Sequence, residues 1–114
     1  MLAARTLSMP IDCPAATVYA FVSKRENLAK WAAGLDPSLQ VRVAPKNDLG
    51  VADHYVTVAP GSEIHVPIRV LANGSGSLVL FTLFRQPEMS DDKFAEDERM
   101  VAADLERLKR LLEA

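Results

Sequence analysis

Residues 63–85 read EIHVPIRVLANGSGSLVLFTLFR, and this stretch decides the fold. Two apolar-rich runs flank the central residues 73–76, Asn-Gly-Ser-Gly, which are typical of a tight β-hairpin turn. A two-residue loop at the centre of this turn places Ile68 opposite Phe81. The stretch therefore predicts two antiparallel strands joined by a short turn.

Two further strands are predicted on the N-terminal side of this hairpin. Residues 39–44 alternate between apolar and polar side chains, and the run 50–59 is followed by a Pro-Gly turn. Connections this short cannot carry a parallel crossover, so residues 39–86 predict an antiparallel meander of four strands. Pro67 has no backbone donor, and it predicts a bulge or an interrupted ladder within the meander.

The turn after residue 59 sets the register of the first hairpin, and a loop of two or four residues there places His65 opposite Val56. Side chains alternate between faces, so a one-residue slip would reverse the assignment of a whole strand. The predicted inner face, which meets the long helix, holds Val51, Tyr55, Ile64, Val66, Ile68, Val70, Val79, Phe81 and Leu83. The predicted outer face holds His54, Glu63, His65, Pro67, Arg69, Leu71, Leu80, Thr82 and Phe84.

A long helix is predicted after the meander. Ser90 is a suitable N-cap, and the acidic residues that follow it and the basic residues near the other end both suit the helix dipole. With about 22 residues, the helix would span roughly 33 Å. Its apolar stripe consists of Phe94, Val101, Leu105, Leu108 and Leu112.

The N-terminal part predicts one strand and two short helices. Residues 5–11 alternate with a period of two, and the Asp-Cys-Pro sequence that follows is a helix start for a helix ending near Val22. Ser23 and Glu26 have the spacing of a capping box for a second helix, which Gly34 ends.

Composition excludes several classes of protein. The 114 residues fit one domain, 1–114, and the net charge of −2 lacks the basic surplus of a nucleic-acid binder. The single cysteine, Cys13, excludes an internal disulfide and a zinc cluster, and it is interpreted as a packed or capping residue. We expect no secretory signal in residues 1–10 and no membrane span, so a cytoplasmic location is the default interpretation.

Two parts of the sequence resemble a known family. The stretch SMPIDCPAATVYAFV at residues 8–22, followed by ENLAKW at 26–31, resembles the N-terminal signature of START-like (SRPBCC) proteins. The stretches GVADHYVT at 50–57 and FTLFRQPEMS at 81–90 are similar to the small bacterial members labelled polyketide cyclase/dehydrase-like.

The resemblance implies an α+β helix-grip fold. In this fold, a curved antiparallel sheet of about five strands wraps around the long C-terminal helix, and two short helices follow the first strand. Members bind apolar or amphipathic small molecules between the sheet and the helix, and only some members are enzymes. Typical members have six or seven strands, so one hairpin is missing here and the cavity should be smaller than usual or absent.

The resemblance and the predicted faces together give the expected ligand contacts. These are Phe21, Trp31, Tyr55, Val66, Ile68, Phe81, Leu83, Val101, Leu105 and Leu108. The weak catalytic candidates are Asp53 and Tyr55, the one titratable pair that the predicted register turns inward. The commoner interpretation of Asp53 is a strand-end aspartate that reaches water or a loop N–H, and the commoner interpretation of Trp31 is a residue that seals the helix pair against the sheet edge.

No metal site or cofactor is predicted. His54 and His65 have no second metal ligand at close spacing, and solvated sheet residues are the commoner interpretation of both. Two hypotheses about function remain open. The first is a binding protein for a small apolar or amphipathic molecule, with cyclase- or dehydratase-like chemistry implied by resemblance. The second is a non-enzymatic interaction module whose cavity is filled or vestigial.

The predicted outer face is unusually apolar for a solvated sheet, which predicts a homodimer. The two histidines would lie in or beside the dimer interface, so acidification through about pH 6 should loosen it. The apolar residues of this face are Val56, Val58, Leu71, Leu78, Leu80 and Phe84.

Overall fold

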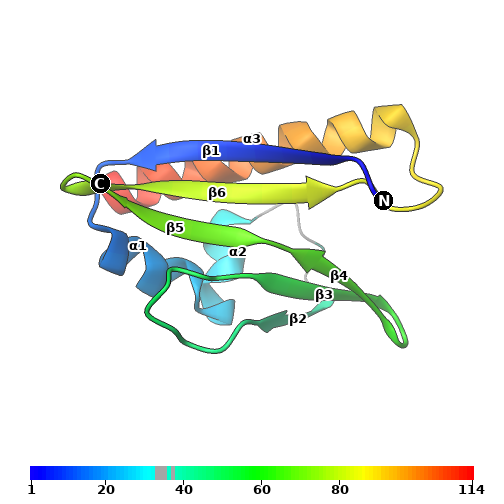
Figure 1. Ribbon diagram of the computed structural model, residues 1–114, viewed down its shortest axis with the longest axis horizontal. Coiled ribbons are helices and arrows are strands. Elements are labelled where there is room, and N and C mark those ends of the chain that lie inside the picture. Colours follow the sequence, from blue (N-terminus) through cyan, green and yellow to red (C-terminus); the bar gives the residue numbers. More distant parts are fainter. Residues whose placement is uncertain (33–35, 37) are drawn as a thin grey trace.

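The computed structural model describes residues 1–32, 36 and 38–114, and it has the α+β architecture that the sequence predicts (Figure 1). The elements, in chain order, are β1 (Ala4–Ile11), α1 (Ala15–Val22), the 3-10 helix η1 (Arg25–Asn27), α2 (Leu28–Trp31), β2 (Gln40–Val43), β3 (His54–Ala59), β4 (Ser62–Val66), β5 (Ile68–Asn73), β6 (Gly76–Phe84) and α3 (Asp91–Glu113). The predicted end of the second helix at Gly34 lies outside the described residues. No helix in the described part is long and apolar enough to cross a membrane.

The strands form two three-stranded antiparallel sheets, in the orders β1-β6-β5 and β2-β3-β4. The predicted run 63–72 is divided at Pro67 into β4 and β5, which confirms the predicted interruption and gives six strands where about five were expected. Backbone bonds join the two sheets across this break. The amide of Ala52 donates to the carbonyl of Ile68 at 2.8 Å, and the amide of Val70 donates to the carbonyl of Gly50 at 2.9 Å.

The second hairpin has the predicted register, whereas the first does not. Ile68 lies opposite Phe81, as expected for a two-residue turn. In the first hairpin, His65 lies opposite Tyr55 instead of Val56, because an irregularity between residues 57 and 59 shifts the pairing by one residue. A bulge of this kind leaves one residue unpaired and cannot be inferred from the length of a turn.

This shift reverses the faces of β3, which corrects the sequence-based assignment. His54 and Val56 face inward and are buried, whereas Tyr55 lies on the outer face with His65. Val51 is also on the outer face, because it pairs with Arg69.

The long helix α3 runs behind β1 and β6 (Figure 1). The hydroxyl of Ser90 accepts a hydrogen bond from the amide of Lys93 at 3.0 Å, which confirms the predicted N-cap. The apolar stripe is buried at its centre, where Val101, Leu105 and Leu108 join the core. Cys13 is part of the same core, as a packed residue.

The last turn of α3 is attached to the end of β1. The carboxylate of Glu113 accepts a hydrogen bond from the amide of Asp12 at 2.7 Å, and the ammonium of Lys109 donates to the carbonyl of Pro10 at 3.0 Å. The predicted capping box of the second helix does not form, because Lys24 precedes η1 and no side chain caps this helix.

Candidate functional site

A cavity of about 180 Å³ lies between the inner face of the sheet and α3. Its wall is mostly apolar, and residues of α2, β2, β3, β4, β5, β6 and α3 contribute to it. An interior space of about 150 Å³ lined by apolar side chains is known to hold a benzene molecule, so this cavity has the size of one ring. The lining residues are Leu28, Trp31, Ala32, Val41, His54, Val56, Val66, Ile68, Phe81, Leu83, Asp97, Met100, Val101 and Asp104.

Two buried polar side chains, Trp31 and His54, lie in this wall. Trp31 is fully buried and His54 is 3% exposed. Their rings meet edge to face, with the centroids 6.5 Å apart. Neither the indole Nε1 of Trp31 nor either ring nitrogen of His54 has a hydrogen-bond partner in the described part of the chain. A buried polar group left without a partner costs about 1–3 kcal/mol, so three such atoms in one wall are exceptional.

The imidazole of His54 is neutral at physiological pH. Burial lowers its pKa to about 4, because the charged ring would lose its hydration, and the nearby negative charge of Asp53 opposes this shift only in part. A neutral imidazole carries one N–H donor and one nitrogen acceptor. His54 therefore offers the cavity wall a donor and an acceptor without a charge.

The two carboxylates of the wall belong to α3, and both have cationic partners. Asp104 accepts a hydrogen bond from Arg107 at 2.9 Å, and Asp97 lies 3.0 Å from the ammonium of Lys93. The same guanidinium nitrogen of Arg107 donates to the carbonyl of Trp31 at 2.9 Å, so it ties α2 to α3.

The predicted catalytic residue Asp53 is buried, but it lies on the outer side of the sheet. It stands beside the break at Pro67, where its carboxylate accepts hydrogen bonds from the guanidinium of Arg69 at 2.9 and 3.0 Å and from the amide of Ile68 at 2.9 Å. The Nε2 atom of His65 lies 2.8 Å from the same carboxylate. Burial alone would raise the pKa of Asp53, but these hydrogen bonds outweigh it and lower the pKa to about 2. The carboxylate of Asp53 therefore bonds residues on both sides of the strand break and holds them together.

Tyr55, the other catalytic candidate, also lies on the outer face. Its ring stacks on His65 with centroids 4.8 Å apart, and the guanidinium of Arg42 lies 4.1 Å from its centroid. The expectation that Asp53 and Tyr55 turn inward was wrong for a single physical reason, the bulge in the first hairpin. The structure therefore does not bring this pair to the cavity.

The structure brings six of the ten predicted ligand contacts to the cavity wall. Leu105 and Leu108 belong to the core but not to this wall, Phe21 packs against the core elsewhere, and Tyr55 lies outside. Sequence reasoning missed His54, which alternation would have placed inward if the register had been known. The six residues are Trp31, Val66, Ile68, Phe81, Leu83 and Val101.

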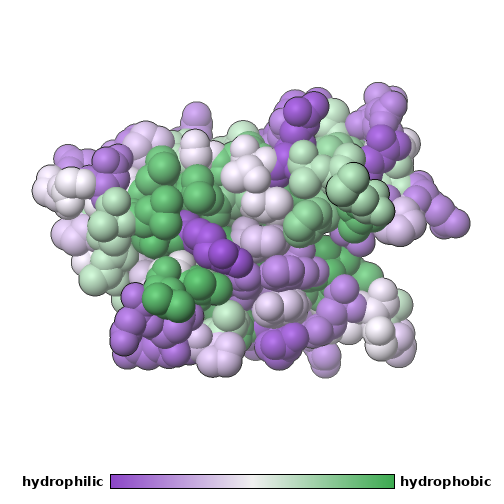
Figure 2. Space-filling model, viewed as in Figure 1, coloured by the Kyte–Doolittle hydropathy of each residue, from purple (hydrophilic) through white to green (hydrophobic). Residues whose placement is uncertain are grey.

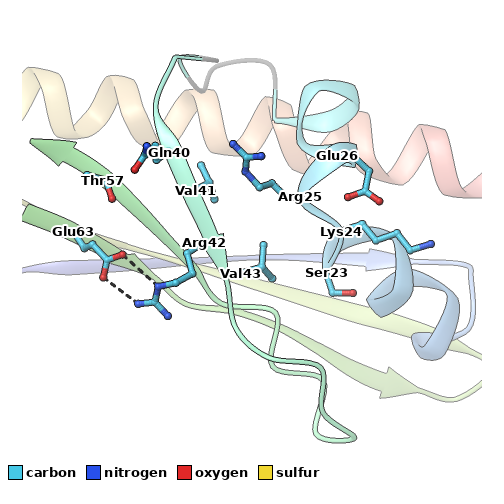
Figure 3. A pocket seen from close by; sticks show the side chains of 10 residues that line it. All are labelled: Ser23, Lys24, Arg25, Glu26, Gln40, Val41, Arg42, Val43, Thr57 and Glu63. Atoms are coloured by element: carbon cyan, nitrogen blue, oxygen red, sulfur yellow. Dashed lines mark hydrogen bonds and ion pairs between the residues drawn. The ribbon is translucent and has the colours of Figure 1, made fainter. Parts of the chain in front are cut away.

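A second, wider hollow of about 770 Å³ lies between β2 and residues 23–26 (Figure 3). Its lining is largely polar and charged, and Arg42 donates to both carboxylate oxygens of Glu63, at 3.0 and 3.4 Å. None of its lining residues has a buried, unpartnered polar atom among the described residues. No cluster of His, Cys, Asp and Glu that could hold a metal ion occurs in the described residues.

No family model and no curated protein matches the sequence. Among solved structures, the chain is similar to XoxI from Bacillus cereus, with 17% identity and a TM-score of 0.75, over 97% of this chain and 96% of that one. It is also similar to the dimeric Aha1 from Colwellia psychrerythraea, with 15% identity and a TM-score of 0.65, over 98% and 97%.

A third similar structure is DynU16, a protein of the dynemicin biosynthetic locus. It shares 16% identity at a TM-score of 0.63, over 97% of this chain and 47% of that one. These identities are low, so the likeness concerns the fold alone. The chain has the α+β helix-grip fold that its sequence predicted, and these structures share it.

Proposed function

We propose that this protein binds one small, largely apolar molecule in the cavity between the sheet and α3. The observation that carries the proposal is the cavity itself, which has about 180 Å³ of space and a wall of aliphatic and aromatic side chains. Burial of apolar surface contributes roughly 25 cal/mol per Å², so a single ring that lies against this wall is stabilised by the apolar surface that it buries.

The competing function is an interaction module whose cavity is filled or vestigial. The volume of about 180 Å³ argues against it, because protein interiors are normally packed as densely as organic crystals. Binding without catalysis is the simpler assignment. Asp53 and Tyr55 lie outside the cavity, and a histidine with a pKa of about 4 is a weak base near neutral pH.

The proposal is tested with toluene, using the fluorescence of Trp31 as the signal. Trp31 is the chain's single tryptophan and lines the cavity, so a bound ring changes its emission directly. We expect a saturable change in the wild type. Val66→Phe puts additional side-chain volume into the cavity wall and should weaken toluene binding at least about tenfold.

The matched control is Val58→Phe, the same substitution at an exposed position of β3 that does not line the cavity. It should bind toluene as the wild type does. If the wild type shows no saturable change, or if both variants behave alike, the cavity is not a binding site and the interaction-module hypothesis takes its place. Mass spectrometry of molecules that copurify with the protein would then be expected to find none.

We also propose that the chain forms a homodimer through the outer face of β5 and β6, and that it acts in the cytoplasm. Figure 2 shows hydrophobic side chains gathered over one end of these strands, with hydrophilic ones toward β3 and β4. Leu71 is 43% exposed, and Leu78, Leu80 and Phe84 are half-buried. The similar Aha1 structure is a dimer, which supports the proposal. Val56 and His54 do not belong to this face, because both are buried inside.

A further inference from the structure

Three buried nitrogen atoms, in the side chains of Trp31 and His54, have no hydrogen-bond partner among the residues that the structure describes. We infer that the bound molecule carries a neutral hydroxyl group, as a single-ring phenol does, and that this hydroxyl lies between the indole of Trp31 and the imidazole of His54. This inference rests on the proposed function and adds the chemical class of the ligand.

The hydrogen-bond donors and acceptors of the two rings favour a ligand that carries a hydroxyl group. The indole Nε1–H of Trp31 can only donate, whereas the neutral imidazole of His54 can donate through one nitrogen and accept through the other. A hydroxyl has one proton to donate and two lone pairs to accept with, so it can bond both side chains at once. The rest of the ring then occupies the apolar part of the wall, which Phe81, Leu83 and Val101 provide.

The two rings are close enough for a shared partner. Their centroids are 6.5 Å apart and both side chains line the same cavity, so a hydroxyl in this part of the cavity can approach both. The χ2 torsion of histidine has broad minima, so the His54 ring can turn a nitrogen toward the cavity without leaving its position. The hydroxyl would give a hydrogen-bond partner to two of the three nitrogen atoms, the indole nitrogen and one imidazole nitrogen.

The charges of the wall favour a neutral ligand. Asp97 and Asp104 line the cavity from α3, and their partners Lys93 and Arg107 are not among the lining residues. The negative charges therefore face the cavity more closely than the positive ones, which disfavours a carboxylate or a phenolate. Each carboxylate is already paired with a cationic side chain, which reduces its attraction for a cationic ligand.

The inference is tested by comparing phenol with toluene, which has the same number of heavy atoms and no hydroxyl. The readout is the indole N–H resonance in an ¹H–¹⁵N spectrum, which is a single peak because the chain has one tryptophan. We expect phenol to shift this peak downfield and to bind about tenfold more tightly than toluene. Toluene should bind without the downfield shift, and benzoate should not bind.

Substitutions of His54 distinguish the contribution of the hydrogen bond to phenol binding from that of the apolar wall. His54→Phe keeps a ring at this position but removes both nitrogens, so the preference for phenol should fall from tenfold to about threefold or less. His54→Gln keeps a donor and an acceptor and should retain the preference. The control is His65→Phe, the same change in the chain's other histidine, which lies on the outer face and should leave phenol binding unchanged.

The outcomes distinguish the two proposals. If neither phenol nor toluene binds, the proposed function is wrong. If toluene binds as tightly as phenol, or if His54→Phe keeps the preference, the cavity is a binding site but the hydroxyl assignment is wrong. Tighter binding of benzylammonium than of phenol would also overturn it, because the carboxylates of α3 would then select the ligand.

Discussion

His54 affects both the stability of the fold and the proposed binding of a ligand. The free energy of unfolding includes the difference in proton affinity of this imidazole between the folded and the unfolded chain. In the unfolded chain its pKa is near 6.5, whereas burial lowers it to about 4 in the folded protein. The unfolded chain therefore takes up a proton at a pH where the folded one does not.

This difference in pKa determines whether the stability of the fold rises or falls with pH. As the pH falls from 6.5 to 4, protonation of unfolded His54 favours unfolding, so stability decreases by about 3 kcal/mol over this window and then levels off. We expect His54→Phe to flatten this part of the profile, as measured by urea denaturation at a series of pH values. Wild type and variant profiles of equal slope would contradict the assignment.

The burial of individual residues could be predicted from the sequence where the periodicity of the apolar residues alone determines it. Leu105 and Leu108 could be placed in the core from the spacing of the helix stripe. His54 could not, because its face depends on a bulge three to five residues away and a histidine gives no hydropathy signal of its own. His54 was therefore missed from the sequence, whereas Trp31 and five of the apolar residues of the wall were predicted.

At the scale of elements, the segment before β3 is held by a close approach between two backbones. Gly50 has a φ of +74°, and a Cβ atom placed there would lie 2.1 Å from the carbonyl oxygen of Val70. Only glycine lets this segment pair with β5, so this single residue helps to join the two sheets across Pro67.

Gly50→Ala should therefore destabilise the protein by at least about 3 kcal/mol, which combines strain at positive φ with displacement of a neighbouring strand. Gly61→Ala is the matched control. Gly61 has the same φ of +74° but has nothing within 4 Å of the added atom, so the cost should be about 1 kcal/mol. Thermal or urea unfolding of both variants measures the difference, and equal losses would show that the close approach is unimportant.

The order of the elements was predicted correctly from the sequence, whereas the pairing of the strands was predicted only in part. The N-cap at Ser90, the break at Pro67 and the tight turn at Gly74 are local signals, and each was confirmed. The register of the first hairpin was missed, because the length of its turn does not reveal an irregularity such as the one between Thr57 and Ala59.

At the scale of the whole molecule, the proposed dimer can be tested through Leu80. This residue lies on the outer face of β6, opposite Ser8, so a charge placed there does not enter the core. Leu80→Glu should turn a dimer into a monomer, because twofold symmetry brings two added charges into one interface. Sedimentation of wild type and variant at roughly tens of micromolar provides the measurement, and a monomeric wild type would refute the dimer.

Arg5→Glu is a suitable control for the sedimentation measurement. Arg5 lies on the same sheet but is exposed at the far end of β1, opposite Leu83, so its charge reversal should leave the association state unchanged. The predicted loosening of the dimer by both histidines no longer follows, because His54 is inside the fold.

The attachment of Glu113 to the amide of Asp12 spans 101 positions in sequence. On a ribosome that adds roughly 5–20 residues per second, β1 is made on the order of ten seconds before α3 emerges to cover it. During this interval the nascent chain exposes its apolar strand face, and α3 can cover this face only after its own residues have been synthesised. Stalling of translation within α3 should therefore leave the chain dependent on chaperones.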